Sequence, residues 1–250
     1  MKIQIKESKK FIEWCELFKF INKMNQHITL MFNTNELYIQ IMDNAHVCLI
    51  DITIPSEWFD LYENNENTVI SVSSASMVKV FSTYTKDSVF EMSLTSDADK
   101  LDISFFNALQ NKNFELNTMD IEQDILSPSV IQTLLDFSIK SSVFDKYITE
   151  LAQFGEDVTI RCSNEKLFFE TNGDEGKLNI ELDGDKLEEF SLVEDYTFHA
   201  KFTIKYLSFI SKFSVNYPFV HLYLDEEHPV RITFDNTEIK INYFLAPKTE

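Results

Sequence analysis

The order of predicted helices and strands repeats along this chain. Apolar residues recur at three- and four-residue intervals in four segments, which predicts helices at about 9–24, 74–85, 142–154 and 202–213. The second pair of helices follows the first by about 130 residues, and strand-like segments fill the intervals in the same order. A period of this length is too long for a solenoid repeat but fits two similar domains.

The segments between the helices alternate apolar and polar residues, as strands with one buried face do. Residues 47–54 and 158–162 show this pattern, and turn-forming clusters such as 33–35 and 172–174 separate neighbouring strands. Short turns join antiparallel strands, so we predict an α+β fold in which two helices of each domain pack on antiparallel sheets.

An acidic stretch that ends at Pro128 separates the two repeats. Its composition predicts a connector rather than a helix or a core strand. We therefore expect an N-terminal domain at 1–118, an interdomain connector loop at 119–133 and a C-terminal domain at 134–250.

Composition limits the classes of function. No apolar run reaches the roughly 18 residues of a membrane span, and no basic region followed by an apolar block opens the chain, so we expect a soluble intracellular protein with no membrane partner. Cys15, Cys48 and Cys162 are widely separated, which predicts neither disulfides nor a zinc site.

Enzymatic motifs are missing from the sequence. The four glycines form neither a P-loop nor a dinucleotide fingerprint, and there is no nucleophile elbow. The acids at 183–189 and 225–227 could in principle hold a divalent metal for nuclease chemistry, but such runs are more often solvated. We predict no catalytic residue, no metal site and no cofactor.

Lysines cluster on the predicted helices although the formal net charge of the chain is -19. In the fourth predicted helix, Lys201, Lys205, Ser208 and Lys212 follow helical spacing without an acid among them. Weaker lines run through Ser76, Lys79, Thr83 and Lys86 in the second helix and through Ser142, Lys146, Thr149 and Gln153 in the third, while the first helix is mixed. On any one helix, such lysines are explained by a solvated face. Lysines on all four helices together favour a common surface that binds phosphates.

Arginine is missing from every predicted helix, since Arg161 and Arg231 lie in strand patterns. The bidentate fork that most often reads guanine is therefore unavailable there. Lysine positions phosphates without reading bases, so we expect non-sequence-specific contact with double-stranded DNA.

Four stretches resemble the proliferating cell nuclear antigen family, the eukaryotic and viral type of DNA sliding clamp. They are 39–49 with Met-Asp-Asn-Ala-His-Val, 151–162, 202–209, and 243–250 with Tyr-Phe-Leu-Ala-Pro-Lys. The resemblance implies the DNA-clamp fold, a homotrimeric ring with helices lining the channel, and work as a processivity factor and docking platform. It implies as partners a DNA polymerase, a clamp loader and proteins with short hydrophobic peptides, such as ligase and nuclease. It also implies a place in the nucleus, or at a cytoplasmic replication site if the protein is virus-encoded.

The resemblance also assigns residues. The channel lining would be Lys10, Lys19, Lys79, Lys146, Lys205 and Lys212. The partner-peptide pocket would be Met42, His46, Val47, Leu49, Ile125, Leu126, Pro128, Pro229, Phe244, Leu245, Ala246 and Pro247. The subunit interface would be Phe114, Leu116, Leu151, Leu178 and Ile180. An exposed apolar patch usually marks a binding site, and lone strand edges favour pairing, which agrees with both surfaces.

Departures from the family pattern leave alternatives open. Thr149 and Gln153 replace expected basic residues, and Asn164 stands where eukaryotic clamps carry the lysine that is modified with ubiquitin. One alternative is a clamp-fold subunit of a heterotrimeric ring or of a viral transcription or replication complex. Another is an acidic protein that mimics DNA.

Overall fold

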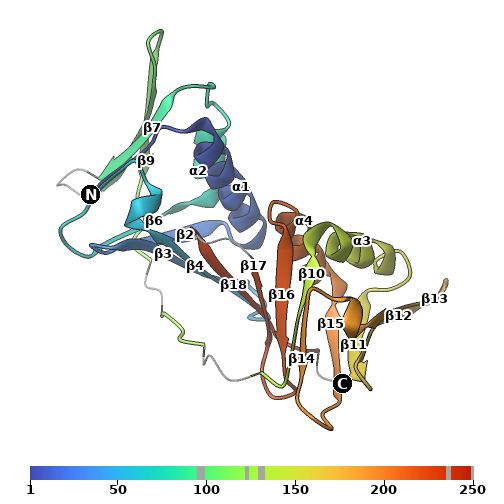
Figure 1. Ribbon diagram of the computed structural model, residues 1–250. Helices are drawn as coiled ribbons and strands as arrows, with labels where there is room; N and C mark the ends of the chain where they lie inside the picture. Colours follow the sequence, from blue (N-terminus) through green and yellow to red (C-terminus); the bar gives the residue numbers. More distant parts are fainter. Residues whose placement is uncertain (95–98, 122–123, 129–132, 235–237, 249–250) are drawn as a thin grey trace. The chain divides into compact units, whose positions relative to one another are not determined.

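The protein is described by a computed structural model that covers residues 1–94, 99–121, 124–128, 133–234 and 238–248. The chain divides into two compact units, which Figure 1 shows in colours that follow the sequence. Unit 1 comprises residues 1–44, 50–126 and 238–240, and unit 2 comprises residues 45–49, 127–237 and 241–250.

Among its described residues, unit 1 contains two α-helices, a 3₁₀ helix and nine strands, although the first residues of β4 belong to unit 2. The helices are α1 (Ser8–Met24), α2 (Ser74–Phe81) and η1 (Ser56–Trp58). The strands are β1 (Lys2–Ile5), β2 (His27–Phe32), β3 (Glu36–Met42), β4 (Cys48–Pro55), β5 (Leu61–Glu63), β6 (Thr68–Ser73), β7 (Val89–Leu94), β8 (Lys100–Phe106) and β9 (Asn111–Asn117). They are ordered β5-β1-β7-β8-β9 and β4-β3-β2-β6.

Unit 2 repeats this inventory. Its helices are α3 (Ser141–Leu151), α4 (Ile204–Ser214) and η2 (Gly184–Lys186). Its strands are β10 (Leu135–Lys140), β11 (Asp157–Ser163), β12 (Lys166–Gly173), β13 (Gly176–Asp183), β14 (Glu189–Leu192), β15 (Phe198–Thr203), β16 (Phe219–Leu224), β17 (Val230–Phe234) and β18 (Lys240–Leu245). They are ordered β14-β10-β16-β17-β18 and β13-β12-β11-β15.

The repeat predicted from the sequence is present element by element. The strand β2 begins at His27 and β11 at Asp157, and α2 begins at Ser74 and α4 at Ile204, so both pairs lie 130 residues apart. All strand pairs with a described register are antiparallel, as expected. The boundaries proposed for the domains stay a prediction, and residues 122–123 and 129–132 of the connector lie outside the described residues.

Two helices end earlier than the apolar spacing predicted. After α2 ends at Phe81, the hydroxyl of Ser82 donates to Lys79 O and that of Thr83 donates to Val80 O. Hydroxyls that bond to preceding carbonyls commonly accompany a helix end. The helix α3 ends at Leu151, so Gln153 lies in the turn that follows it.

Each unit buries one face of its strands beneath its own helix pair, α1 with α2 and α3 with α4. The core of unit 1 is largely aromatic: Trp14 is fully buried, and its ring lies 6.1 Å from that of Trp58 and 4.7 Å from that of Phe18. The polar residues of the alternating strands occupy the opposite face of each sheet. No helix in the described part of the chain is long and apolar enough to cross a membrane.

Candidate functional site

Positive charge is concentrated on the helices. The four α-helices contain eight lysines and four acidic residues, whereas the whole chain has a formal net charge of -19. Neither α2 nor α4 contains an acid. Each helix pair therefore carries a surplus of cations on an otherwise acidic protein.

The lysines predicted to line a channel differ in their surroundings. Lys79, Lys205 and Lys212 are exposed on α2 and α4. The ammonium groups of Lys19 and Lys146 lie 2.6 Å from Glu16 and 3.8 Å from Glu150, which offsets part of their charge. Lys10 donates to Trp58 O at 2.8 Å and is only half-exposed, so it is the least available of the six.

The rows of polar residues that helical spacing predicted along the helices are shorter in the structure. Lys201 lies in β15, and Thr83, Lys86 and Gln153 lie beyond the ends of their helices. The polar residues that remain on helices are Lys205, Ser208 and Lys212 on α4, Ser76 and Lys79 on α2, and Ser142, Lys146 and Thr149 on α3.

One side chain of unit 1 holds the connector segment that contains Ile125 and Leu126. Gln40 on β3 donates from Nε2 to Leu126 O at 2.8 Å and accepts at Oε1 from Leu126 N, also at 2.8 Å. Its second amide hydrogen points to the hydroxyl of Tyr38 at 2.9 Å. Gln40 is 2% exposed, whereas Ile125 and Leu126 are 44% and 45% exposed. The bonds thus fix the backbone while both apolar side chains remain accessible.

A half-buried carboxylate supports this amide. Asp51 on β4 forms a hydrogen bond with Tyr38, the residue that also receives the Gln40 bond. Burial raises the pKa of Asp51, and the hydrogen bond from Tyr38 opposes that rise. No pattern in the sequence singles out Gln40, although it lies within the motif 39–49.

The C-terminal segment of unit 2 is held at two points. Ala246 N donates to Val47 O at 2.9 Å, and Lys248 N donates to Lys201 O on β15 at 2.7 Å. Burial of Asp157 disfavours its charged form, but hydrogen bonds from Lys248 and Lys201 outweigh that cost and hold its pKa below the ordinary value. Lys248 Nζ lies 2.6 Å and Lys201 Nζ 3.4 Å from Asp157 Oδ2.

Most residues predicted for the partner pocket have accessible surface within their own unit. Met42, Val47, Pro128, Phe244, Ala246 and Pro247 are half-buried, and His46 and Pro229 are exposed. His46 has a φ of 57°, which marks the tight turn before β4. Leu245 is fully buried because it alternates into the core with Ile241 and Tyr243 along β18. Leu49 is 7% exposed although it lies on the face of β4 opposite Cys48 and Ile50. The assignment of these two leucines to the partner pocket stays a prediction.

The two strands predicted at a subunit interface lie at the ends of their sheets, β9 in unit 1 and β13 in unit 2. Phe114 and Leu116 on β9 and Leu178, Ile180 and Leu182 on β13 are half-buried on one face. Leu151 is fully buried in α3, and its contact with a neighbouring chain stays a prediction.

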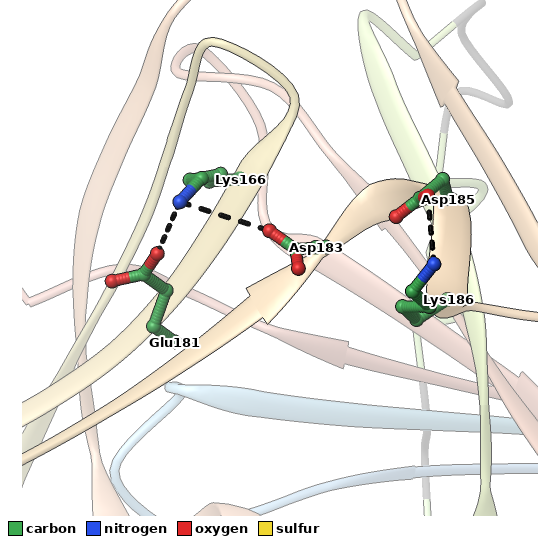
Figure 2. A network of polar contacts seen from close by, with 5 residues as sticks. All are labelled: Lys166, Glu181, Asp183, Asp185 and Lys186. Carbon is green, nitrogen blue, oxygen red and sulfur yellow. Dashed lines mark hydrogen bonds and ion pairs between the residues drawn. The ribbon is translucent and has the colours of Figure 1, made fainter.

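Polar residues occupy the opposite face of both edge strands, and they include Glu115 on β9 and Glu181 and Asp183 on β13. Figure 2 shows Lys166 on β12 between two acids of β13, 2.5 Å from Glu181 and 3.7 Å from Asp183, with the Asp185–Lys186 pair nearby. In unit 1 Lys100 pairs with Glu115 across β8 and β9. These acids are thus engaged by lysines, and no cluster of three or more possible metal ligands occurs among the described residues.

Comparisons with known proteins agree with this architecture. The family model described as proliferating cell nuclear antigen, C-terminal domain, matches residues 133–249, and the one described as proliferating cell nuclear antigen, N-terminal domain, matches residues 11–126. Proliferating cell nuclear antigen 2 of Drosophila melanogaster is 26% identical over 223 residues, which are 88% of each chain. A chain of the PCNA2–PCNA3 complex from Sulfolobus tokodaii has a TM-score of 0.84 at 19% identity, with all of both chains covered.

The geometry predicts that Gln40→Leu releases the connector without unfolding unit 1. The variant keeps a buried side chain of similar size but removes both bonds to Leu126, so amide exchange at Leu126 should rise about tenfold. Hydrogen exchange followed by NMR measures this change. Gln26→Leu, at an exposed position of the same unit, is the control. Unchanged exchange at Leu126 would contradict the anchoring role.

The ion pairs of Asp157 predict a tail whose order depends on pH. Because the folded pKa is lowered, the anchor is complete above the ordinary value of 3.8 and is lost as pH falls through the folded pKa. Lys248→Met should weaken the anchor at neutral pH as well. Heteronuclear NOE values of the Ala246 and Lys248 amides measure tail order, with Lys186→Met as the control. Equal order in the wild type and Lys248→Met would count against the anchor.

Proposed function

Because this chain belongs to the proliferating cell nuclear antigen family, we propose that it is a sliding clamp that encircles duplex DNA. In this proposal it serves as a processivity factor for a DNA polymerase and as a docking platform for other replication and repair proteins. It performs no chemistry itself. A clamp loader places it on DNA, in the nucleus or at a cytoplasmic replication site if a virus encodes it.

The concentration of lysines on the helices is the observation that carries the proposal. DNA affinity without sequence preference depends on cations that replace counterions at phosphates. Lys79, Lys205 and Lys212 are exposed on helices that contain no acid, while the acids gather elsewhere on the chain. Lys19 and Lys146 contribute less because Glu16 and Glu150 lie beside them. We therefore place the DNA against the helices and expect contacts that salt weakens readily.

The two sheet edges support a closed ring. An edge strand whose backbone groups lack a partner favours pairing with another strand. Since β9 and β13 are different edges of one chain, their pairing is head to tail, and such contacts close into rings when the rotation between subunits allows it. Phe114 and Leu116 would pack against Leu178 and Ile180 of a neighbour. Three copies of this chain form the ring in the proposal.

A ring with other subunits is the second candidate. The similar archaeal structure is a complex of two different PCNA chains. In that ring, β9 and β13 of this chain would pair with the equivalent edge strands of a different protein. The native mass of the purified chain separates this candidate from the homotrimer.

Partner docking is proposed for two groups of residues. The first is Met42 with Ile125 and Leu126, whose side chains are accessible beside the Gln40 anchor. The second comprises His46, Val47, Pro128, Pro229, Phe244, Ala246 and Pro247 in unit 2. Each group by itself would offer a contact surface to a short hydrophobic peptide of a polymerase, ligase or nuclease. Methionine suits such a role because its flexible side chain fits different partners.

The DNA assignment predicts a selective effect of lysines on the helices. Replacing Lys205 and Lys212 by alanine should lower DNA affinity and reduce the salt slope of log K by about 2, because each lysine contributes about one phosphate contact. Primer extension on circular DNA should give shorter products. The control is Lys166→Ala with Lys186→Ala, which removes the same charge from acid-paired lysines. Equal effects of the two double variants on DNA affinity would contradict the assignment of Lys205 and Lys212 to the channel. If the variant without these two lysines still bound a DNA-binding protein as the wild type does, a DNA mimic would be favoured.

The edge-strand assignment predicts the native mass. Light scattering at micromolar concentration should give a mass near three chains for the wild type and one chain for Phe114→Glu, since the substitution buries a charge at the contact. Asn113→Glu places the same charge on the opposite face of β9 and is expected to keep the mass of the wild type. A wild type with the mass of one chain would favour the ring with other subunits. If Phe114→Glu kept the mass of three chains, β9 would not be the interface.

A further inference from the structure

The repeat allows the polar face of each four-stranded sheet to be compared position by position. Thr29, Gln40 and Ser71 of unit 1 correspond to Thr159, Glu170 and Lys201 of unit 2, each 130 residues later. The backbone contacts correspond as well. Met119 N donates to Ser71 O at 2.8 Å, and Lys248 N donates to Lys201 O at 2.7 Å. The connector and the C-terminal segment therefore each donate a backbone hydrogen bond to the equivalent strand position of their own unit.

The faces differ in what covers them. In unit 1 the chain continues from Met119 to Leu126, which binds Gln40, and Thr29, Gln40 and Ser71 are only 4%, 2% and 4% exposed. In unit 2 the side chains of Glu170 and Lys201 are 36% and 47% exposed. The surface that the connector covers in unit 1 is thus open in unit 2.

A cleft occupies this open surface. Its volume is about 840 Å³, and Phe154, Asp157, Thr159, Glu170, Asp174 and Lys201 are among its lining residues. Gly155 and Gly173 bring backbone close together at one end, since an added Cβ on Gly173 would lie 1.9 Å from Phe154 O. The cleft, which we call the β11–β12 cleft, lies wholly within unit 2.

The difference between Gln40 and Glu170 indicates what the cleft accepts. An amide both donates and accepts, so Gln40 can hold both polar groups of a peptide unit, whereas an ionised carboxylate only accepts. Glu156, Asp157, Glu170 and Asp174 outnumber Lys177 and Lys201 among the charged lining residues. Asp157 Oδ1 is buried without a hydrogen-bond partner among the described residues, although Oδ2 binds two lysines.

We propose that the β11–β12 cleft is a second docking site, which binds an extended segment of a partner protein carrying lysine or arginine. The segment lies across β15, β11 and β12, and it corresponds to the connector residues that bond to Ser71 on β6 and to Gln40 on β3 in unit 1. It places a second cation at Glu170, whose carboxylate already pairs with Arg161 at 3.2 Å, where unit 1 uses Gln40 to hold Leu126. Six residues lie between Met119 and Leu126, so a segment of similar length reaches from the Lys201 end to Glu170.

The test uses labelled eight-residue peptides with blocked ends, in which alanine alternates with arginine, glutamine or glutamate. NMR titration of the ¹⁵N-labelled full chain should show the arginine peptide shifting the amides of Thr159, Glu170 and Lys201. The glutamate peptide should leave them unchanged. Glu170→Gln should raise the dissociation constant of the arginine peptide about three- to fivefold, as expected for one partly exposed ion pair.

Two matched controls separate the cleft from general attraction to an acidic protein. Glu188→Gln removes the same charge from an exposed position outside the cleft lining. Thr159→Trp fills the cleft and should abolish site-specific binding, whereas Ser163→Trp adds the same bulk to the same face of β11 outside it. Shifts spread over the whole acidic surface, equal losses in the two glutamate variants, or full binding by Thr159→Trp would overturn the proposal. The titration contains no DNA, so its result is independent of the clamp function.

Discussion

Two helices can cover only one face of the sheets in each unit, and the rest of the structure follows from this limit. The alternation of the strands supplies the apolar face, as in Val158 and Ile160, and leaves polar residues such as Thr159 on the other. That second face must be covered by other chain segments or remain hydrated. In unit 1 the connector covers it and is fixed there by Gln40, whereas unit 2 leaves a cleft at the equivalent place.

The sequence was sufficient for the features that depend on local patterns. Helical spacing and strand alternation predicted four helices, antiparallel sheets and a repeat of about 130 residues, because the period of apolar residues determines which face is buried. The helix ends were less predictable, since hydroxyls of Ser82 and Thr83 bond to carbonyls after α2. Leu245 is buried because it lies on the apolar face of an alternating strand, whereas the resemblance to the family assigned it to the partner pocket.

The contacts that anchor the connector and the C-terminal segment could not be predicted from the sequence, for a different reason. Gln40 and Leu126 are 86 residues apart, and Asp157 and Lys248 are 91 apart, so only the folded chain brings them together. A single glutamine or aspartate on the polar face of a strand gives no sequence signal of such a contact. The same holds for the hydrogen bond from Lys10 to Trp58 O, which joins residues 48 apart and leaves Lys10 less available than Lys205.

Both tryptophans of the chain, Trp14 and Trp58, lie in the core of unit 1. The two similar halves therefore differ in their optical properties. Excitation at the red edge of the protein absorption band selects the indole rings and reports on the N-terminal repeat, while unit 2 contributes no indole emission. A fluorescence melting curve of this protein describes the unfolding of one half, and circular dichroism is needed to observe the other.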